Sequence, residues 1–181
     1  MISDRYEIRL AGMGGQGLIL AGIILAEAAA IYDGKNAVQT QSYGPEARGG
    51  ASRAEVIISS GLVDYPEVTQ ADLLLALSQE GCDKYYYSLK KEGILIVDAE
   101  RVTRVPTNQA YRVPITSIAR QATGRTITSN VVSLGLIVGI TDIVSREAIE
   151  RAVAARAPKG TEEMNLKALA AGFEEALKLK R

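Results

Sequence analysis

The segment with the clearest chemical meaning is Gly12-Met13-Gly14-Gly15-Gln16-Gly17. It follows a strand-like apolar stretch and precedes a long apolar stretch that predicts a helix. A glycine turn in this position exposes backbone N–H groups at the positive end of the helix, where a phosphate or carboxylate can bind. In this interpretation Gly12 permits the tight turn, Gly14 lets a ligand approach, and Gly17 lets the helix pack against the strand.

A dinucleotide-binding domain has a second requirement, an acidic residue near the end of the second strand that binds the ribose hydroxyls. That strand is expected at Asn36–Gln41, and no acid stands at its end. Asp33 precedes the strand, and Glu46 lies beyond it. The chain also lacks the G-K-S/T sequence of a P-loop. A nucleotide-dependent oxidoreductase is therefore disfavoured, and a tight turn without a ligand remains an alternative.

A second glycine-rich segment lies between two predicted strands. Its Arg48 offers a planar guanidinium group suited to a phosphate or carboxylate. Ligands of doubly wound sheets bind at the carboxyl ends of strands, so we expect this segment to lie beside the glycine turn. The alternative is a surface loop in which Glu46 and Arg48 pair with each other. The candidate binding residues here are Ser42, Tyr43, Gly44, Arg48, Gly49 and Gly50.

Composition excludes several classes of function. The 181 residues predict a single domain, residues 1–181, and the formal net charge of zero argues against a nucleic-acid binder. With no histidine and one cysteine, Cys82, the chain offers no ligand set for a metal or an iron–sulfur cluster. The apolar stretch Leu18–Ile31 is interrupted by Gly22 and Glu27, so no membrane span is predicted. We expect a protein of the reducing cytoplasm.

The arrangement of predicted strands and helices indicates the fold. Apolar runs predict strands at Tyr6–Ala11, Asn36–Gln41, Ala54–Ser59, Asp72–Leu77, Gly93–Asp98 and Ala110–Val113. Helices are predicted at Gly15–Tyr32, from Ser78 to about Leu89, within Arg125–Thr141, at Arg146–Ala157 and after Thr161. This alternation predicts an α/β fold, a three-layer α/β/α sandwich with a mostly parallel sheet and a Rossmann-like first βα unit. Because no helix joins the second and third strands, the sheet is expected to be mixed.

Other residues permit both a functional and a structural interpretation. Cys82 lies near a predicted helix start, where a thiolate can be stabilised, but no histidine could activate it, which favours an ordinary, partly buried thiol. Tyr85-Tyr86-Tyr87 spreads over more than one helix face, so at least one ring should be exposed, where it could contact a partner. Asn130 could cap a helix or face a ligand. Gly135 and Gly139 would permit a close helix–helix approach.

Taken together, the two glycine-rich segments resemble the gamma subunit of 2-oxoacid:ferredoxin oxidoreductases. The similarity extends to Asp64-Tyr65-Pro66, Leu77-Ser78-Gln79-Glu80 and Asn165–Leu169, and it covers nearly the whole chain. The sequence of Ser42–Gly50 is most similar to the 2-oxoglutarate branch of the family and less similar to the pyruvate branch.

The resemblance implies a division of labour among subunits. The family oxidatively decarboxylates a 2-oxoacid and joins the acyl group to coenzyme A, with ferredoxin as electron acceptor. Thiamine diphosphate and magnesium would be held by alpha and beta subunits, and iron–sulfur clusters by partners that could include a ferredoxin-like delta subunit. This chain would contribute coenzyme A binding and assembly, with no catalytic residue or metal of its own. In isolation it could form a homodimer.

The resemblance also gives the two segments a shared role, which is to line a surface that faces coenzyme A or the catalytic subunits. An assembly module that binds no ligand remains an alternative. The cofactor-binding residues implied by the resemblance are Gly12, Gly14, Gly15, Gln16, Gly17, Ser42, Tyr43, Gly44, Arg48, Gly49, Gly50 and Asn130.

Overall fold

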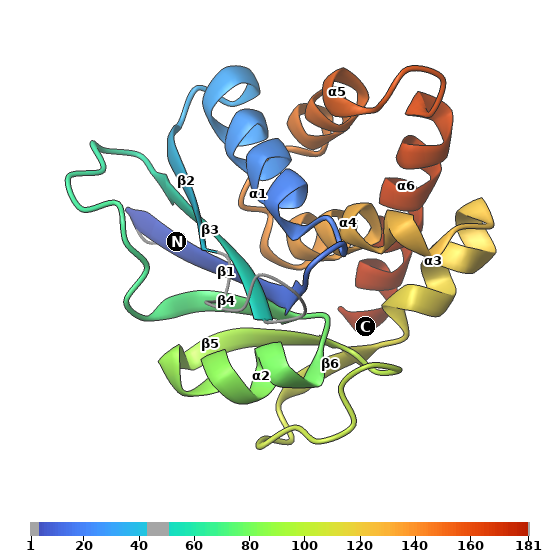
Figure 1. Ribbon diagram of the computed structural model, residues 1–181. Helices are drawn as coiled ribbons and strands as arrows, with labels where there is room; N and C mark the ends of the chain where they lie inside the picture. Colours follow the sequence, from blue (N-terminus) through green and yellow to red (C-terminus); the bar gives the residue numbers. More distant parts are fainter. Residues whose placement is uncertain (1–3, 43–50, 181) are drawn as a thin grey trace.

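The computed structural model of the protein describes residues 4–42 and 51–180. Its centre is a six-stranded sheet with the strand order β2-β3-β1-β4-β5-β6 (Figure 1). Strand β3 runs antiparallel to both of its neighbours, β1 and β2, whereas β1, β4, β5 and β6 are parallel. The predicted mixed, mostly parallel sheet is therefore confirmed. The strands are β1 (Arg5–Met13), β2 (Asn36–Ser42), β3 (Ala51–Ser59), β4 (Ala71–Ala76), β5 (Leu89–Asp98) and β6 (Ala110–Val113).

Helices cover both faces of the sheet, so the predicted three layers are also confirmed, but the two outer layers are unequal. Helices α1, α3, α4, α5 and α6 pack on one face through the larger apolar core, and α2 packs on the other face. The helices are α1 (Leu18–Glu27), α2 (Gln79–Tyr85), α3 (Ile115–Thr123), α4 (Ser129–Thr141), α5 (Arg146–Arg156) and α6 (Glu162–Leu179). Three short turns accompany them, η1 (Ala28–Tyr32), η2 (Tyr86–Ser88) and η3 (Thr126–Thr128).

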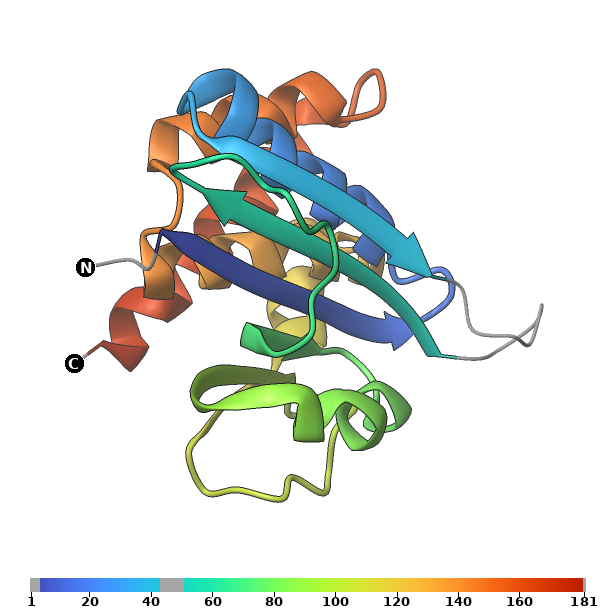
Figure 2. The same cartoon turned by 90° about the vertical axis from the view of Figure 1, so that its left-hand side faces the viewer.

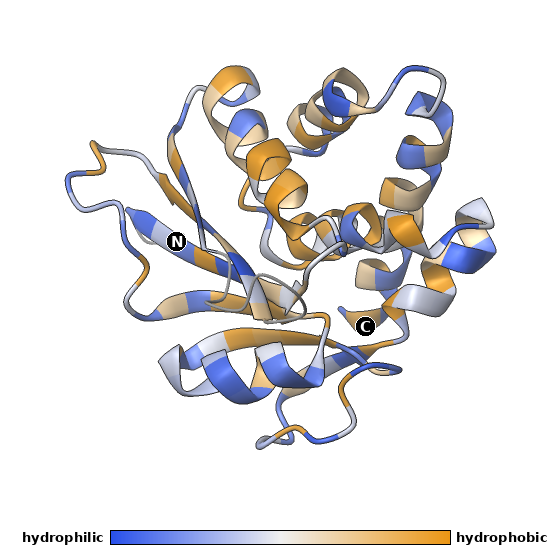
Figure 3. Ribbon diagram, in the orientation of Figure 1, coloured by the Kyte–Doolittle hydropathy of each residue, from blue (hydrophilic) through white to orange (hydrophobic). Residues whose placement is uncertain are grey.

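The alternation of side chains along the strands explains the two cores. In β4, Leu73 and Leu75 enter the larger core, whereas Leu74 and Ala76 enter the smaller core on the opposite face. A central strand covered on both faces is therefore a continuous apolar run. Figure 3 shows the same apolar character on α1 and α4 and along β5.

Helices α4 and α6 approach each other closely at glycines. A Cβ atom added to Gly135 would lie 2.3 Å from the Leu169 carbonyl oxygen, and one added to Gly172 would lie 2.2 Å from the Val132 carbonyl oxygen. Neither backbone can move without separating the helices. The close approach predicted at Gly135 and Gly139 is confirmed, and the structure identifies α6 as the facing helix.

Helix boundaries differ from the prediction where glycine or a distant cap sets them. Helix α1 begins at Leu18 and not at Gly15, because Gly15 and Gly17 have φ angles of 86° and 72°. Helix α3 was not predicted, since it follows Pro114 and has no local capping side chain. Its capping acceptor is Asp98 at the end of β5, whose Oδ2 accepts the backbone N–H of Thr116.

One predicted cap is wrong. The side chain of Thr161 does not cap α6, because its hydroxyl donates a hydrogen bond to the Pro158 carbonyl oxygen. The caps predicted at Ser78 and Ser145 are confirmed, since their hydroxyls accept the N–H groups of Gly81 and Ala148. Across residues 4–42 and 51–180, no helix combines the length and apolar character that crossing a membrane requires.

Candidate functional site

The glycine turn and the two ends of the second glycine-rich segment lie at one edge of the sheet. Strands β1 and β2 end at this edge, and β3 begins there (Figure 2). In the strand register Met13 is opposite Ala51 and Ser42 is opposite Arg53. The predicted proximity is confirmed for these ends, and we call this region the glycine edge (Met13–Gly17, Ser42 and Ala51). Tyr43, Gly44, Arg48, Gly49 and Gly50 lie outside the described residues.

The strand order further weakens the dinucleotide alternative. In a dinucleotide-binding fold the second strand lies next to the first, and its end brings an acid to the ribose. Here β3 lies between β1 and β2, so the end of β2 is not adjacent to the glycine turn. The structure therefore lacks the arrangement of strands that the glycine motif would need for that function.

Gln16 organises the glycine turn from within. Its Oε1 accepts the Met13 N–H at 2.7 Å, and its Nε2 donates to the Leu77 carbonyl oxygen at 3.0 Å. Because Leu77 follows β4, this side chain joins the end of β1 to the end of β4. A Cβ atom at Gly12 would lie 2.2 Å from Gln16 Oε1. Glycine at position 12 is thus required to leave room for Gln16, whose amide is engaged at both ends.

Gly17 and Asn130 form a second structural contact. Gly17 has a φ angle of 72°, and a Cβ atom there would lie 2.5 Å from Asn130 Nδ2. Asn130 is buried, with Nδ2 donating to the Gly17 carbonyl oxygen and Oδ1 accepting the Val131 N–H. The N-cap of α4 is Thr128, so the interpretation of Asn130 as its cap is wrong. Asn130 instead joins α4 to the glycine turn.

Gly14 and Gly15 are different, because side chains added there would contact none of the described residues. A Cβ atom at either position would have no atom of residues 4–42 or 51–180 within 4 Å. Gly15 still has a conformational requirement, since its φ angle is 86°. Gly14 has no positive φ angle and is exposed. Within the described segments, neither packing nor backbone conformation therefore requires a glycine at position 14.

A small cavity of about 150 Å³ opens beside Gly15. The amino-terminal ends of three helices meet at this cavity. Gly15 and Gln16 precede α1, Thr116 lies in the first turn of α3, and Ser129 is the first residue of α4. The amino-terminal end of a helix carries a partial positive charge and free N–H groups. Among the described residues, the N-cap residues of α1 and α4 provide no side-chain acceptor, although Asn130 Oδ1 accepts the Val131 N–H in α4 and Asp98 caps α3. The cavity residues are Gly15, Gln16, Arg101, Thr116, Thr126, Ile127 and Ser129.

Arg101 is the one charged residue among the described residues that line this cavity. It is exposed, and its guanidinium group makes no hydrogen bond or ion pair with any residue of the described segments. The backbone holds it in place through a bond from the Arg101 N–H to the Asp98 carbonyl oxygen. The sequence interpretation missed Arg101. The sequence did contain a signal for Arg101, because this basic residue follows the predicted strand Gly93–Asp98 by three positions. Residues in that position are expected at the carboxyl edge of the sheet.

Apolar side chains surround the glycine edge and are exposed. Met13 at the end of β1, Leu20 in the first turn of α1 and Ile127 in η3 retain 44%, 37% and 58% of their surface. Ile127 also lines the small cavity. An exposed apolar rim beside a positively charged cavity is typical of a surface that a partner protein covers.

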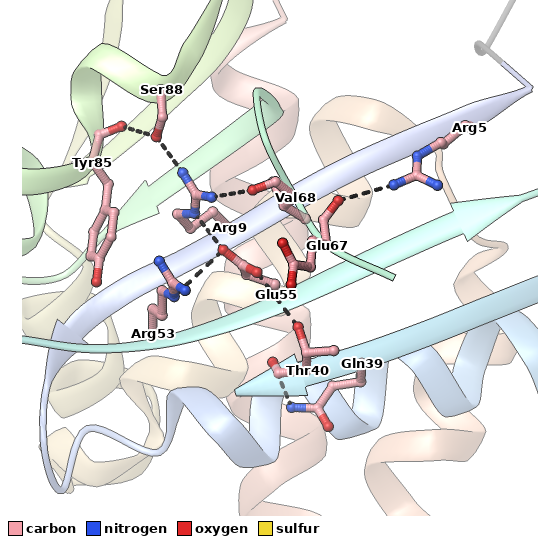
Figure 4. Close-up of polar contacts among 10 residues, drawn as sticks. All are labelled: Arg5, Arg9, Gln39, Thr40, Arg53, Glu55, Glu67, Val68, Tyr85 and Ser88. Carbon is pink, nitrogen blue, oxygen red and sulfur yellow. Dashed lines mark hydrogen bonds and ion pairs between the residues drawn. The ribbon is translucent and has the colours of Figure 1, made fainter. Parts of the chain in front are cut away.

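A second polar cluster lies on the face of the sheet that α2 covers (Figure 4). Its polar groups are bonded to one another within the chain. Arg9 Nε pairs with Glu55 Oε1 at 2.8 Å, Nη2 donates to the Val68 carbonyl oxygen at 2.6 Å, and Nη1 donates to Ser88. The Arg9 guanidinium also lies over the Tyr85 ring, 5.3 Å from its centroid. This buried cluster joins β1, β3 and η2 and offers no free group to a ligand.

Comparison with known proteins settles the family. The sequence pattern that describes pyruvate ferredoxin/flavodoxin oxidoreductases matches residues 7–175. The chain belongs to this family. The resemblance inferred from the two glycine-rich segments is confirmed, and the match spans almost the whole chain.

Relatives within the family differ in their similarity to this oxidoreductase chain. The 2-oxoglutarate synthase subunit KorC of Methanocaldococcus jannaschii is 50% identical, with 98% of this chain and 97% of the relative covered. The pyruvate synthase subunit PorC of the same organism is 32% identical over 95% of this chain and 97% of the relative. The higher identity to the 2-oxoglutarate subunit agrees with the branch inferred from Ser42–Gly50.

Solved structures show the same fold. The keto/oxoacid ferredoxin oxidoreductase gamma subunit from Geobacter sulfurreducens is 54% identical, with a TM-score of 0.89 over 97% of this chain and 98% of that chain. A 2-oxoglutarate:ferredoxin oxidoreductase from Magnetococcus marinus, solved with 2-oxoglutarate, coenzyme A and succinyl-CoA, has a TM-score of 0.83. It is 22% identical and is matched over 98% of this chain and 31% of that chain, so it supports the fold alone.

The single cysteine of this family member is a structural residue. Cys82 is fully buried in the smaller core, and burial, followed by the nearby Asp83, raises the pKa of its thiol. A neutral, inaccessible thiol is a poor nucleophile. The structure therefore supports the interpretation of Cys82 as an ordinary thiol, and shows it to be fully rather than partly buried.

Proposed function

We propose that this chain is the gamma subunit of a 2-oxoglutarate:ferredoxin oxidoreductase, and that its glycine edge binds the anionic part of coenzyme A beside the catalytic subunits. Such an enzyme converts 2-oxoglutarate and coenzyme A to succinyl-CoA and carbon dioxide, with the electrons passing to ferredoxin. Identity of 50% to a 2-oxoglutarate synthase subunit, against 32% to a pyruvate synthase subunit of the same organism, supports the choice of substrate.

The coenzyme A proposal rests on Arg101, whose guanidinium group has no bonding partner in the described segments, at a cavity around which three helices begin. Phosphates are bound in proteins by arginine guanidinium groups and by the N–H groups at helix amino-termini. Coenzyme A carries several phosphate charges, and the open surface at Gly14 permits close approach of such a group to the backbone.

The remaining chemistry belongs to partners. Thiamine diphosphate, when bound with magnesium by alpha and beta subunits, would supply the acyl carbanion chemistry, and iron–sulfur clusters in partner subunits would carry the electrons. A ferredoxin-like delta subunit is a further candidate partner, and the cytoplasm is the proposed location. Within residues 4–42 and 51–180 no group of three or more histidine, cysteine, aspartate or glutamate side chains could hold a metal ion.

An assembly-only role is the second candidate, and the exposed Met13, Leu20 and Ile127 favour it. In that case the glycine edge would contact a catalytic subunit directly, and Gly14 would be covered by protein instead of coenzyme A. The two candidates predict different effects of removing the charge at position 101.

The experiment that distinguishes the two candidates is Arg101→Ala in the assembled enzyme, with Arg120→Ala as the matched control. Arg120 is also exposed and lies on α3, and its side chain makes no hydrogen bond or ion pair with the described residues. Loss of one guanidinium–phosphate contact should raise the KM for coenzyme A by about tenfold, while the KM for 2-oxoglutarate and the subunit composition stay unchanged.

An unchanged KM for coenzyme A would refute the proposed role of Arg101. Loss of subunit association without a change in that KM would favour the assembly-only role. Arg48→Ala, measured in the same way, tests whether the predicted residue in the second glycine-rich segment also contributes to coenzyme A binding.

A further inference from the structure

A second open surface lies beside α2, on the face of the sheet opposite the five larger helices. Tyr86 and Tyr87 of η2 separate two hollows of about 590 and 250 Å³, and both rings line both hollows. The two rings meet edge to face, with centroids 5.3 Å apart. Tyr87 retains 82% of its surface, so the fold itself does not bury this aromatic ring.

Positive charge predominates around the two tyrosines. Arg104 and Arg112 line the first hollow, and Lys90 and Lys91 line the second. Lys90 pairs with Asp72 at 2.7 Å, and Arg104 has only a 3.4 Å exposed pair with Asp83. Lys91 and Arg112 make no ion pair with any residue of the segments that the structure describes.

Gln79 fixes the shape of the first hollow. Its Oε1 accepts the N–H groups of Thr103 and Arg104, each at 3.0 Å, and its Nε2 donates to the Arg104 carbonyl oxygen and to Asp83. The loop after β5 is therefore held against α2 before any partner binds. The same bonds occupy the backbone N–H groups that a phosphate would need.

We propose that the tyrosine surface (Tyr86, Tyr87, Lys91, Arg104 and Arg112) binds an acidic segment of another subunit of the enzyme. An aliphatic or proline side chain of that segment would pack on Tyr87, and its carboxylates would pair with Lys91 and Arg112. Exposed tyrosine and arginine side chains are the residues most enriched at protein interfaces. This inference rests on the proposed function, since it requires the multi-subunit enzyme.

A nucleotide fits this surface less well than an acidic protein segment does. Asp83 lines the first hollow and would repel a polyphosphate, and the N–H groups of Thr103 and Arg104 are already bonded. A protein segment can instead place its carboxylates beside the cations and avoid Asp83. The complementary partner is therefore an acidic peptide surface with an apolar residue at its centre.

The test measures association of the full chain with the purified alpha and beta subunits by titration calorimetry at two salt concentrations. Tyr87→Ala and Lys91→Glu should each weaken association by about tenfold or more, and the effect of Lys91→Glu should diminish at high salt. Tyr65→Ala and Lys159→Glu are the controls, because both positions are exposed and neither lines the tyrosine surface.

Unchanged association of both variants would overturn the proposal. So would a raised KM for coenzyme A with unchanged association, because that result would assign the surface to a nucleotide. Thermal unfolding of each variant verifies that the chain remains folded. The outcome is independent of the Arg101→Ala experiment, which changes the KM for coenzyme A and leaves association intact if the proposed function holds.

Discussion

The buried Arg9–Glu55 cluster and the glycine edge are both polar regions. The polar groups of the cluster are bonded within the chain, whereas those of the glycine edge are accessible to a ligand or a partner. Arg9 uses its guanidinium nitrogens on Glu55, Ser88 and Val68. The Arg101 side chain makes no hydrogen bond or ion pair with the described residues, and none of those residues would exclude a Cβ atom at Gly14. A polar group that is fully bonded within the chain stabilises or orients the fold, whereas an open one is available to a ligand or a partner.

The largest effect should follow from removing the charge at the centre of the buried cluster. Glu55→Gln keeps the size of the side chain and deprives Arg9 of its ion pair, while the side chain of Arg9 is only 5% exposed. An unpaired buried cation destabilises a fold strongly, so the free energy of unfolding should fall by about 3–5 kcal/mol. Urea denaturation of the chain measures this change.

Glu150→Gln is the control for that variant. Glu150 pairs with Arg146 at 2.8 Å, but the two side chains are 44% and 59% exposed. An exposed pair contributes about 0.5 kcal/mol or less. Equal losses for Glu55→Gln and Glu150→Gln would show that the buried cluster is not a structural centre, and the contrast with the glycine edge would fail.

A smaller effect is expected within the glycine turn. Gly17→Ala combines a φ angle of 72° with a Cβ atom 2.5 Å from Asn130 Nδ2. Gly160→Ala should be destabilised only by its backbone conformation, because the φ angle is 81° and no described atom lies within 4 Å of the added Cβ atom. The conformational cost is about 1–2 kcal/mol for both, and Gly17→Ala should lose at least about 1 kcal/mol more. Equal losses would show that the Asn130 contact contributes little.

Local patterns were sufficient to predict most of the fold. The continuous apolar run of β4 and the missing helix between β2 and β3 predicted a covered, mixed sheet, and both features are present. Helix α3 was missed because its capping acceptor, Asp98, lies on β5 and not beside the helix start. The placement of β3 between β1 and β2 also depends on contacts distant in sequence.

The site was predicted less completely than the fold. The sequence indicated the glycine turn, but not that Gln16 fills it or that Gly12 and Gly17 make room for Gln16 and Asn130. Arg101 was missed because only the folded chain brings the loop after β5 beside the turn after β1. The binding roles of Ser42 and of the residues at 43–50 stay predictions.

The most direct test of the open glycine edge is Gly14→Val, with the KM for coenzyme A in the assembled enzyme as the measurement. The account predicts a KM raised at least about tenfold, with the free energy of unfolding unchanged within about 0.5 kcal/mol and the subunits still associated. An unchanged KM would contradict it. A KM that rises only together with lost stability or lost association would also contradict it, because the glycine would then serve the fold or the assembly.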